Sequence, residues 1–329
     1  MKQKVTIQDI ADMAGVAKST VSRYLNNGYV SKEKAALIDK VIEKTGYKSN
    51  FFAQRLKTKN SRLIGIVMPR LDSFSASKLL AGFNLILQQE DYQVLILVSD
   101  LQIAKEIANI RQLIQQGVDG IIVQSIAITD EHLSIVKNAS IPIIFTGQSH
   151  DKVTYLKVND MKAGHIMGNY IAHLNHDNVV YLGVSDGDIA VGIKRRQGFI
   201  DGFMSANPKG TVHFVETDFS FDLAYTKGSE VLAFNPTAVV CATDNIALGL
   251  LRYMHEKNIK VPQQISLAGF GGYPYSNISY PSLTTISFDY KHLGAKTADK
   301  LLMMLKGTKV QSEFDNNLIF ITQESTQKI

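Results

Sequence analysis

The chain has few of the residues that carry redox and metal chemistry. Its 329 residues include one cysteine, Cys241, and no tryptophan. A single cysteine excludes an internal disulfide framework and CxxC metal pairs, and the eight histidines show no HExxH or other paired ligand spacing. No apolar run approaches the length of a membrane span, and the polar start MKQKVTIQDIAD lacks a secretory signal core. We therefore expect a cytoplasmic protein with no metal site, no cofactor and no membrane partner.

Positive charge is concentrated in the first 60 residues. They hold twelve lysines and arginines against five acidic residues, a net charge of +7, whereas the whole chain carries +5. Residues 61–329 therefore sum to −2. A basic segment ahead of a near-neutral body is typical of nucleic-acid binding, although a solvated basic surface would give the same count.

Residues 1–60 show three short helical patterns. Thr6 and Asp9 have the spacing of a capping box, ahead of a first helix that ends at Gly15. A second helix is predicted over about 17–26 and a third over 31–45. The glycine turn between the first two helices predicts a helix-turn-helix, whose second helix enters the major groove of DNA. An ordinary three-helix cap is the alternative.

The stretch VTIQDIADMAGVAKSTVSRYLN resembles the head of the LacI/GalR family of bacterial repressors, and the likeness extends along the whole chain. By this resemblance Lys18, Ser19 and Arg23 face base edges. The residues that contact phosphates or hold the second helix in place are Thr6, Thr20, Ser22 and Asn26. The resemblance thus implies a DNA-binding transcriptional repressor that is not an enzyme.

The next segment resembles the hinge helix of the same family, with the pattern NxxAxxL at Asn50, Ala53 and Leu56. A helix this short is marginal in water, so we expect it to order only when two copies meet on DNA. Ala53 would let the two helices approach, and Leu56 would insert between base pairs in the minor groove. Ser49 stands where family members usually carry proline. The resemblance implies a homodimer on a palindromic operator; a plain connector is the alternative for this segment.

Strand and helix patterns alternate through the rest of the chain. Short apolar strands followed by helices, among them helices over 189–205 and 223–234, repeat in two blocks, which predicts parallel sheets covered by helices. Ligands of such sheets bind beyond the carboxyl ends of the strands, so two lobes place a ligand in the cleft between them. With the resemblance, the expected fold class is α/β: an N-terminal all-α helix-turn-helix head plus a two-lobed periplasmic-binding-protein-like body with doubly wound parallel sheets.

The resemblance also implies domain boundaries. The expected domains are a helix-turn-helix DNA-binding domain at 1–47, a hinge helix at 48–61, and an effector-binding and dimerisation domain at 62–329. The last divides into an N-lobe, about 62–159 and 289–317, and a C-lobe, about 160–288 and 318–329.

Sugar binding needs planar polar side chains for hydroxyl pairs and aromatic faces for C–H surfaces. Arg195 stands where family members carry a cleft arginine, whose fork donates to two vicinal oxygens or to a phosphate. Phe219 takes the family's aromatic stacking position, and Arg70 could meet a phosphate together with Arg195. The other expected effector contacts are Asp72, Ser73, Phe74, Ser125, Gln148, Asp160 and Asp244. For each of these a loop cap or a hydrogen bond between the lobes is the alternative.

Gly271 stands where many family members carry an aspartate that binds sugar hydroxyls. A glycine there is expected to enlarge the pocket for a disaccharide or a different hydroxyl pattern. The stretches PRLDS, DFSF and GFGGYP are most similar to sucrose-operon repressors of Gram-positive bacteria. We therefore expect control by a sucrose-like disaccharide or its phosphate, with a trehalose-type or catabolite-control regulator of the same family as the alternative.

One pattern favours enzyme chemistry instead. Residues 183–187 read GVSDG, which matches the nucleophile elbow GxSxG that follows a strand, and His213, His255 and His292 lie downstream. Five loosely specified positions also occur by chance. A serine hydrolase using Ser185 is therefore kept only as a remote alternative.

Overall fold

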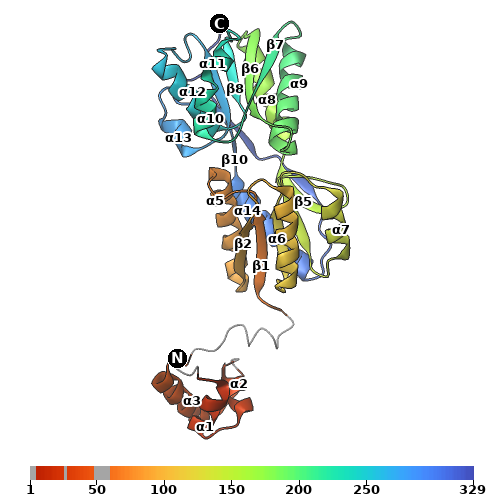
Figure 1. Cartoon of the computed structure of the whole chain (residues 1–329), viewed down its shortest axis with the longest axis vertical. Coiled ribbons are helices and arrows are strands. Elements are labelled where there is room, and N and C mark those ends of the chain that lie inside the picture. The colour runs from red at the N-terminus through yellow and green to blue at the C-terminus, as the bar shows by residue number, and fades with distance from the viewer. Residues whose placement is uncertain (1–4, 26–27, 48–59) are drawn as a thin grey trace. The chain divides into compact units, whose positions relative to one another are not determined.

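The structure is a computed structural model that describes residues 5–25, 28–47 and 60–329. It separates into two compact units, Met1–Ser61 and Arg62–Ile329, here termed the head and the body (Figure 1). Each unit has its own hydrophobic core, so each is described by itself.

The described part of the head consists of three helices, α1 (Ile7–Ala14), α2 (Lys18–Leu25) and α3 (Lys32–Thr45). The predicted capping box is confirmed at the start of α1. The Thr6 amide donates to Asp9 Oδ2 at 2.8 Å, and the Asp9 amide donates to Thr6 Oγ1 at 3.3 Å. These two bonds satisfy amides that a helix start otherwise leaves unpaired.

A small apolar centre holds the three helices together. Gly15 ends α1 with φ at 64°, in the left-handed region where a side chain would be strained. This turn lets α2 fold back onto α1. The buried core residues of the head are Ile10, Ala11, Ala14, Val21, Ile38 and Val41.

The N-lobe of the body is a six-stranded sheet in the order β11-β5-β4-β3-β1-β2, with parallel pairing throughout. Its strands are β1 (Leu63–Met68), β2 (Gln93–Val98), β3 (Gly120–Gln124), β4 (Ile143–Thr146), β5 (Thr154–Val158) and β11 (Glu313–Asp315). Its helices are α5 (Phe74–Leu87), η1 (Gln88–Glu90), α6 (Ile103–Gln115), α7 (Asp130–Asn138) and α14 (Tyr290–Leu305). The continuous apolar runs in β1, β3 and β4 are buried because helices cover both faces of the sheet.

The C-lobe is a second six-stranded sheet, in the order β12-β10-β9-β8-β6-β7, in which only β12 runs antiparallel to its neighbour. Its strands are β6 (Asn178–Val184), β7 (Thr211–Thr217), β8 (Ala238–Cys241), β9 (Ser266–Gly271), β10 (Thr284–Phe288) and β12 (Leu318–Ile321). Its helices are α8 (Asp160–His173), η2 (Ile189–Arg195), α9 (Arg196–Ala206), α10 (Phe221–Thr226), α11 (Gly228–Leu232), α12 (Asp244–Glu256) and α13 (Pro274–Ile278).

The chain passes between the lobes in three places: between β5 and α8, between β10 and α14, and between β11 and β12. As a result α14, late in the sequence, packs beside α5 in the N-lobe (Figure 1). Apart from the antiparallel strand β12, the two sheets are the doubly wound parallel sheets predicted from the alternating pattern.

Two predicted helices of the C-lobe are each divided in the structure. The helix predicted over 189–205 begins as a π-helix, η2, before α9 continues it. The helix predicted over 223–234 is two short helices, because the chain turns at Lys227. Gly228 follows this turn against Tyr253, and a Cβ there would lie 2.1 Å from the tyrosine ring.

Glycines bring α8 and α9 into backbone contact. A Cβ at Gly164 would lie 2.1 Å from the Arg195 carbonyl oxygen, and one at Gly198 would lie 2.1 Å from the Met161 carbonyl oxygen. Only glycine permits so close an approach. The packing brings the start of α8, which carries Asp160, against the end of η2, which carries Arg195.

Within the described ranges, no helix is long and apolar enough to span a membrane. The same part of the chain has no cluster of three or more histidine, cysteine, aspartate or glutamate side chains placed to hold a metal ion.

Candidate functional site

The second helix of the head presents polar and basic side chains to solvent. Lys18, Ser19 and Arg23, the residues expected to face base edges, are all exposed on α2. Val21 lies fully buried in the head core and holds the opposite side of the helix in place. The arrangement is suited to placing α2 in a DNA groove.

The remaining expected DNA contacts lie beside this helix or outside the described residues. Thr6 is exposed and serves the capping box, and Thr20 and Ser22 are partly buried on α2. The expectations for Asn26 and for the hinge residues Asn50, Ala53 and Leu56 fall outside the described residues.

The body holds a cavity of about 230 Å³ between its two lobes. Nine of the eleven expected effector residues line it: Arg70, Asp72, Ser73, Phe74, Ser125, Gln148, Asp160, Arg195 and Phe219. Further lining residues that the sequence analysis did not single out include Asp188, Thr243, Asn245, Tyr273 and Tyr290. Polar and aromatic side chains therefore share the same walls.

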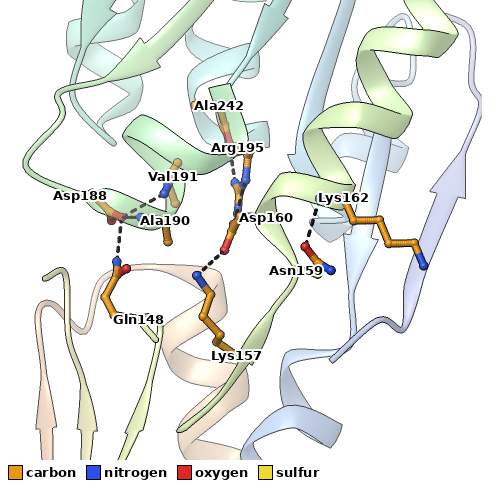
Figure 2. Close-up of polar contacts among 10 residues, drawn as sticks. All are labelled: Gln148, Lys157, Asn159, Asp160, Lys162, Asp188, Ala190, Val191, Arg195 and Ala242. Atoms are coloured by element: carbon orange, nitrogen blue, oxygen red, sulfur yellow. Dashed lines mark hydrogen bonds and ion pairs between the residues drawn. The ribbon is translucent and has the colours of Figure 1, made fainter. Parts of the chain in front are cut away.

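The Arg195 guanidinium donates three hydrogen bonds to acceptors of the protein (Figure 2). Its Nη2 and Nε atoms donate to Asp160 Oδ1 at 2.7 and 3.2 Å, and Nη1 donates to the carbonyl oxygen of Ala242 at 2.7 Å. Lys157 Nζ lies 3.2 Å from the other oxygen of Asp160. Arg195 and Asp160 are 3 % and 2 % exposed, so this is a buried ion pair.

Aromatic rings surround the same guanidinium. Its Cζ lies 5.2 Å from the centroid of Phe270 and 5.1 Å from that of Phe288. Burial opposes the charge, but Asp160 more than offsets this, so the pKa of Arg195 is raised. Arg195 lines the cavity, yet its donors are largely engaged by protein acceptors. These hydrogen bonds hold Arg195 in the C-lobe wall.

Asp188 is a cavity residue that the sequence analysis missed. Its Oδ1 accepts from the amides of Ala190 and Val191, both at 3.0 Å, and from Gln148 Nε2 of the N-lobe at 3.3 Å (Figure 2). Burial raises the pKa of Asp188. Its position just beyond the carboxyl end of β6 is the signal that could have identified it, because ligands meet doubly wound sheets at that edge.

The N-lobe wall carries an ion pair of a different kind. Arg70 Nε donates to Asp72 Oδ1 at 2.6 Å, and Asp72 is 77 % exposed. The Arg70 guanidinium also lies 5.5 Å from the ring of Phe219 in the C-lobe. A second contact between the lobes joins Phe74 and Tyr273, whose ring centroids are 4.8 Å apart. The two lobes thus meet through side chains that line the cavity.

Asp244 and Gly271 do not line the cavity. The Asp244 carboxylate points into the C-lobe, where it accepts from the Tyr273 amide, from Ser276 Oγ at 2.9 Å each, and from Thr285 Oγ1 at 2.6 Å. A Cβ at Gly271 would lie 2.4 Å from the Tyr273 ring. Tyr273 therefore fills the space that glycine was expected to open, and burial raises the pKa of this tyrosine to about 12.

The serine of the GxSxG pattern has no catalytic partner in the described part of the chain. Ser185 is exposed, and no histidine is bonded to its side chain. His213 instead stacks on Phe234, with centroids 4.6 Å apart. The geometry gives no support to the hydrolase alternative.

Comparison with known proteins agrees with both units. Residues 6–50 match the family model for bacterial regulatory proteins of the lacI family, and residues 169–326 match a periplasmic binding protein-like domain. The chain is 35 % identical over 302 residues to the sucrose operon repressor of Staphylococcus xylosus, covering 91 % of this chain and 93 % of that relative. It is 28 % identical over 311 residues to the transcriptional regulator TreR of Salmonella typhimurium, covering 93 % and 96 % of the two chains.

Among solved structures, the lac repressor dimer bound to operator and the anti-inducer ONPF superposes with a TM-score of 0.88. The match covers 99 % of this chain and 100 % of that chain at 23 % identity, which supports the fold. With the head and body both matched, and with a relative at 35 % identity along nearly the full length, the chain belongs to the lacI family of bacterial regulatory proteins.

Proposed function

We propose that this protein is a cytoplasmic transcriptional repressor of a sugar-utilisation operon, which binds operator DNA as a homodimer and a sugar between its lobes. The observation that carries the proposal is the 35 % identity to a sucrose operon repressor across 91 % of the chain. The relatives that it matches are transcriptional regulators and not enzymes.

The head supplies the DNA contacts in this proposal. Lys18, Ser19 and Arg23 read base edges from the exposed side of α2. The net charge of +7 over residues 1–60 attracts the phosphate backbone and makes binding steeply salt-dependent. Two hinge segments that approach each other at Ala53 would place Leu56 between base pairs in the minor groove.

The body supplies the sugar site. Phe74, Phe219 and Tyr273 offer ring faces for the C–H surfaces of a sugar, while Gln148 and Asp188 offer polar atoms for its hydroxyls. The favoured ligand is a sucrose-like disaccharide or its phosphate. A trehalose-type or catabolite-control regulator is the second candidate. A sugar that prefers a lobe arrangement incompatible with paired hinges would shift the population of repressor off DNA.

The DNA proposal is tested by comparing two variants in mobility shifts on operator and on unrelated DNA. Arg23→Ala should lose about 1–3 kcal/mol of discrimination for the operator, because it removes a base contact. Lys44→Ala removes the same charge from the exposed end of α3 and should weaken binding to both DNAs equally. Equal losses on the two DNAs for Arg23→Ala would contradict the assignment of α2.

The sugar proposal is tested by thermal shift with sucrose, trehalose, their 6-phosphates and fructose. A ligand present at 100 times its Kd stabilises the folded state by about 2.7 kcal/mol, which a melting curve resolves. We expect the largest shift with sucrose or its 6-phosphate. No shift with any sugar in the panel would overturn the sugar proposal and leave the DNA proposal untouched.

A further inference from the structure

Behind the N-lobe wall of the cavity lies a buried polar unit formed by Glu106 of α6, His132 of α7 and Ser125 after β3. Glu106 is 1 % exposed, His132 0 % and Ser125 3 %. Glu106 Oε1 lies 2.5 Å from Ser125 Oγ and 2.9 Å from His132 Nε2. Of the three, Ser125 alone lines the cavity. Buried polar side chains such as these are stable only when other groups of the protein satisfy their hydrogen bonds.

The hydrogen bonds determine where the histidine proton lies. The backbone amide of Thr129 donates to His132 Nδ1 at 3.1 Å, so Nδ1 is an acceptor. A neutral imidazole then carries its proton on Nε2, and Nε2 donates to Glu106 Oε1. His132 is thus oriented by the start of its own helix and holds the Glu106 carboxyl in place.

The Ser125 hydroxyl proton is also taken up by acceptors of the protein. Ser125 Oγ has two acceptors within reach, Glu106 Oε1 at 2.5 Å and the Ala127 carbonyl oxygen at 2.7 Å. A hydroxyl has one proton to donate, and both acceptors belong to the protein. Whichever of them receives it, the proton is used inside the N-lobe and only lone pairs of Oγ remain for a ligand.

We propose that Glu106 and His132 are positioning residues for the sugar site, which hold Ser125 so that its oxygen accepts a hydrogen bond from a hydroxyl of the bound sugar. The inference rests on the proposed function and adds two residues to it that do not touch the cavity. The loop they hold also meets the other lobe, because the Ile189 amide donates to the Ile126 carbonyl oxygen at 3.2 Å. The loop held by this unit therefore carries both a cavity residue, Ser125, and a contact that joins the lobes.

The test is a double-mutant cycle on the full-length protein, with sucrose binding measured by calorimetry. Glu106→Gln and Ser125→Ala should each weaken sucrose binding about five-fold, the equivalent of one hydrogen bond. If Glu106 acts through Ser125, the double variant should be no weaker than about five-fold. Independent losses that multiply to about 25-fold, or unchanged affinity in Glu106→Gln, would overturn the proposal.

A matched control separates positioning from general stability. His176 is another fully buried histidine, bonded to Thr237 Oγ1 at 3.0 Å and to the Gln327 carbonyl oxygen at 3.2 Å in the C-lobe. His176→Asn should lower the melting temperature and leave sucrose affinity unchanged. A loss of affinity as large as that of Glu106→Gln would show a structural effect and overturn the proposal.

A second readout does not depend on the sugar. Nitrogen-15 NMR spectra of the imidazole rings in the unliganded protein should show that His132 is protonated on Nε2 and unprotonated on Nδ1. The opposite tautomer would overturn the proposed orientation of Glu106 even if sucrose binds. If no sugar binds the wild-type protein, the sugar proposal and the hydroxyl contact both fail, and the tautomer still decides whether this unit orients Glu106.

Discussion

The two lobes of the body share a strand order but bring different groups to the cavity. The N-lobe sheet runs β11-β5-β4-β3-β1-β2 and the C-lobe sheet runs β12-β10-β9-β8-β6-β7, so strands correspond one to one. In the C-lobe wall Arg195 and Asp160 form a buried pair, whereas in the N-lobe wall Arg70 pairs with a carboxylate that is 77 % exposed. Topology therefore places the loops of the two lobes alike, whereas burial determines which side chains are fixed before a ligand binds.

The two ion pairs are also expected to contribute differently to stability. An exposed ion pair contributes about 0–1 kcal/mol, because water and salt screen it. A buried pair is costly to break, since the remaining charge has no water to solvate it. We therefore expect the Arg195 part of the C-lobe wall to be rigid and the Arg70 part of the N-lobe wall to adjust around the sugar.

The largest predicted effect comes from breaking the buried pair. Arg195→Ala should lower the free energy of unfolding by about 3–5 kcal/mol, because Asp160 is left buried with Lys157 alone. The neighbouring Arg196 pairs with Asp186, which is 68 % exposed, and its guanidinium lies 4.2 Å from the Phe214 ring, so Arg196→Ala is the control and should cost no more than about 2 kcal/mol. Urea denaturation of both variants measures the difference, and similar losses would refute the contrast between buried and exposed pairs.

A smaller effect is predicted for the pH dependence of stability. The pKa of Asp188 is raised by burial above the ordinary value of 3.8, so the folded state binds its proton more tightly than the unfolded state. Stability from this group is therefore lost as pH rises from about 3.8 through the raised pKa. Asp188→Asn should remove that part of the slope while keeping an oxygen for the Ala190 and Val191 amides, at a cost below about 1 kcal/mol.

Denaturation of Asp188→Asn and wild type at a series of pH values checks this prediction. The wild type should lose stability relative to the variant as pH rises across that window. Parallel pH curves would mean that burial of the Asp188 carboxylate has no consequence for folding.

The smallest effect on stability is predicted for the exposed pair. Arg70→Ala should change the free energy of unfolding by less than about 1 kcal/mol, because Asp72 remains in water when its partner is removed. The comparison with Arg195→Ala uses the same denaturation measurement. A loss near that of Arg195→Ala would show that the Arg70 pair is held as firmly as the Arg195 pair.

The fold was predictable because its signals are local. The capping box at Thr6 and Asp9 needs residues three apart, and the alternation of apolar strands with helices needs segments of a dozen residues. Both are confirmed. The division of the predicted helix over 189–205 was not predictable, since η2 depends on capping by Asp188 and on close packing against β6.

The site was predictable as a set of residues more than as a set of contacts. Strand ends and the family resemblance selected nine residues that line the cavity. The engagement of Arg195 by Asp160 depends on backbone contact between α8 and α9, which joins positions 35 residues apart. Likewise, the sequence around Gly271 does not predict that the Tyr273 ring occupies the space beside this glycine. Such contacts arise from packing, which residue types alone do not encode.

We propose that a sugar bound in the cavity controls the binding of the head to operator DNA. The direct measurement is operator affinity by mobility shift, with and without saturating sucrose, for wild type and Phe219→Ala. Sucrose should weaken operator binding by the wild type. Phe219 is a partly buried cavity residue, so its variant should bind operator normally and lose the response. Operator affinity that stays unchanged while calorimetry shows sucrose bound to the wild type would contradict the claim.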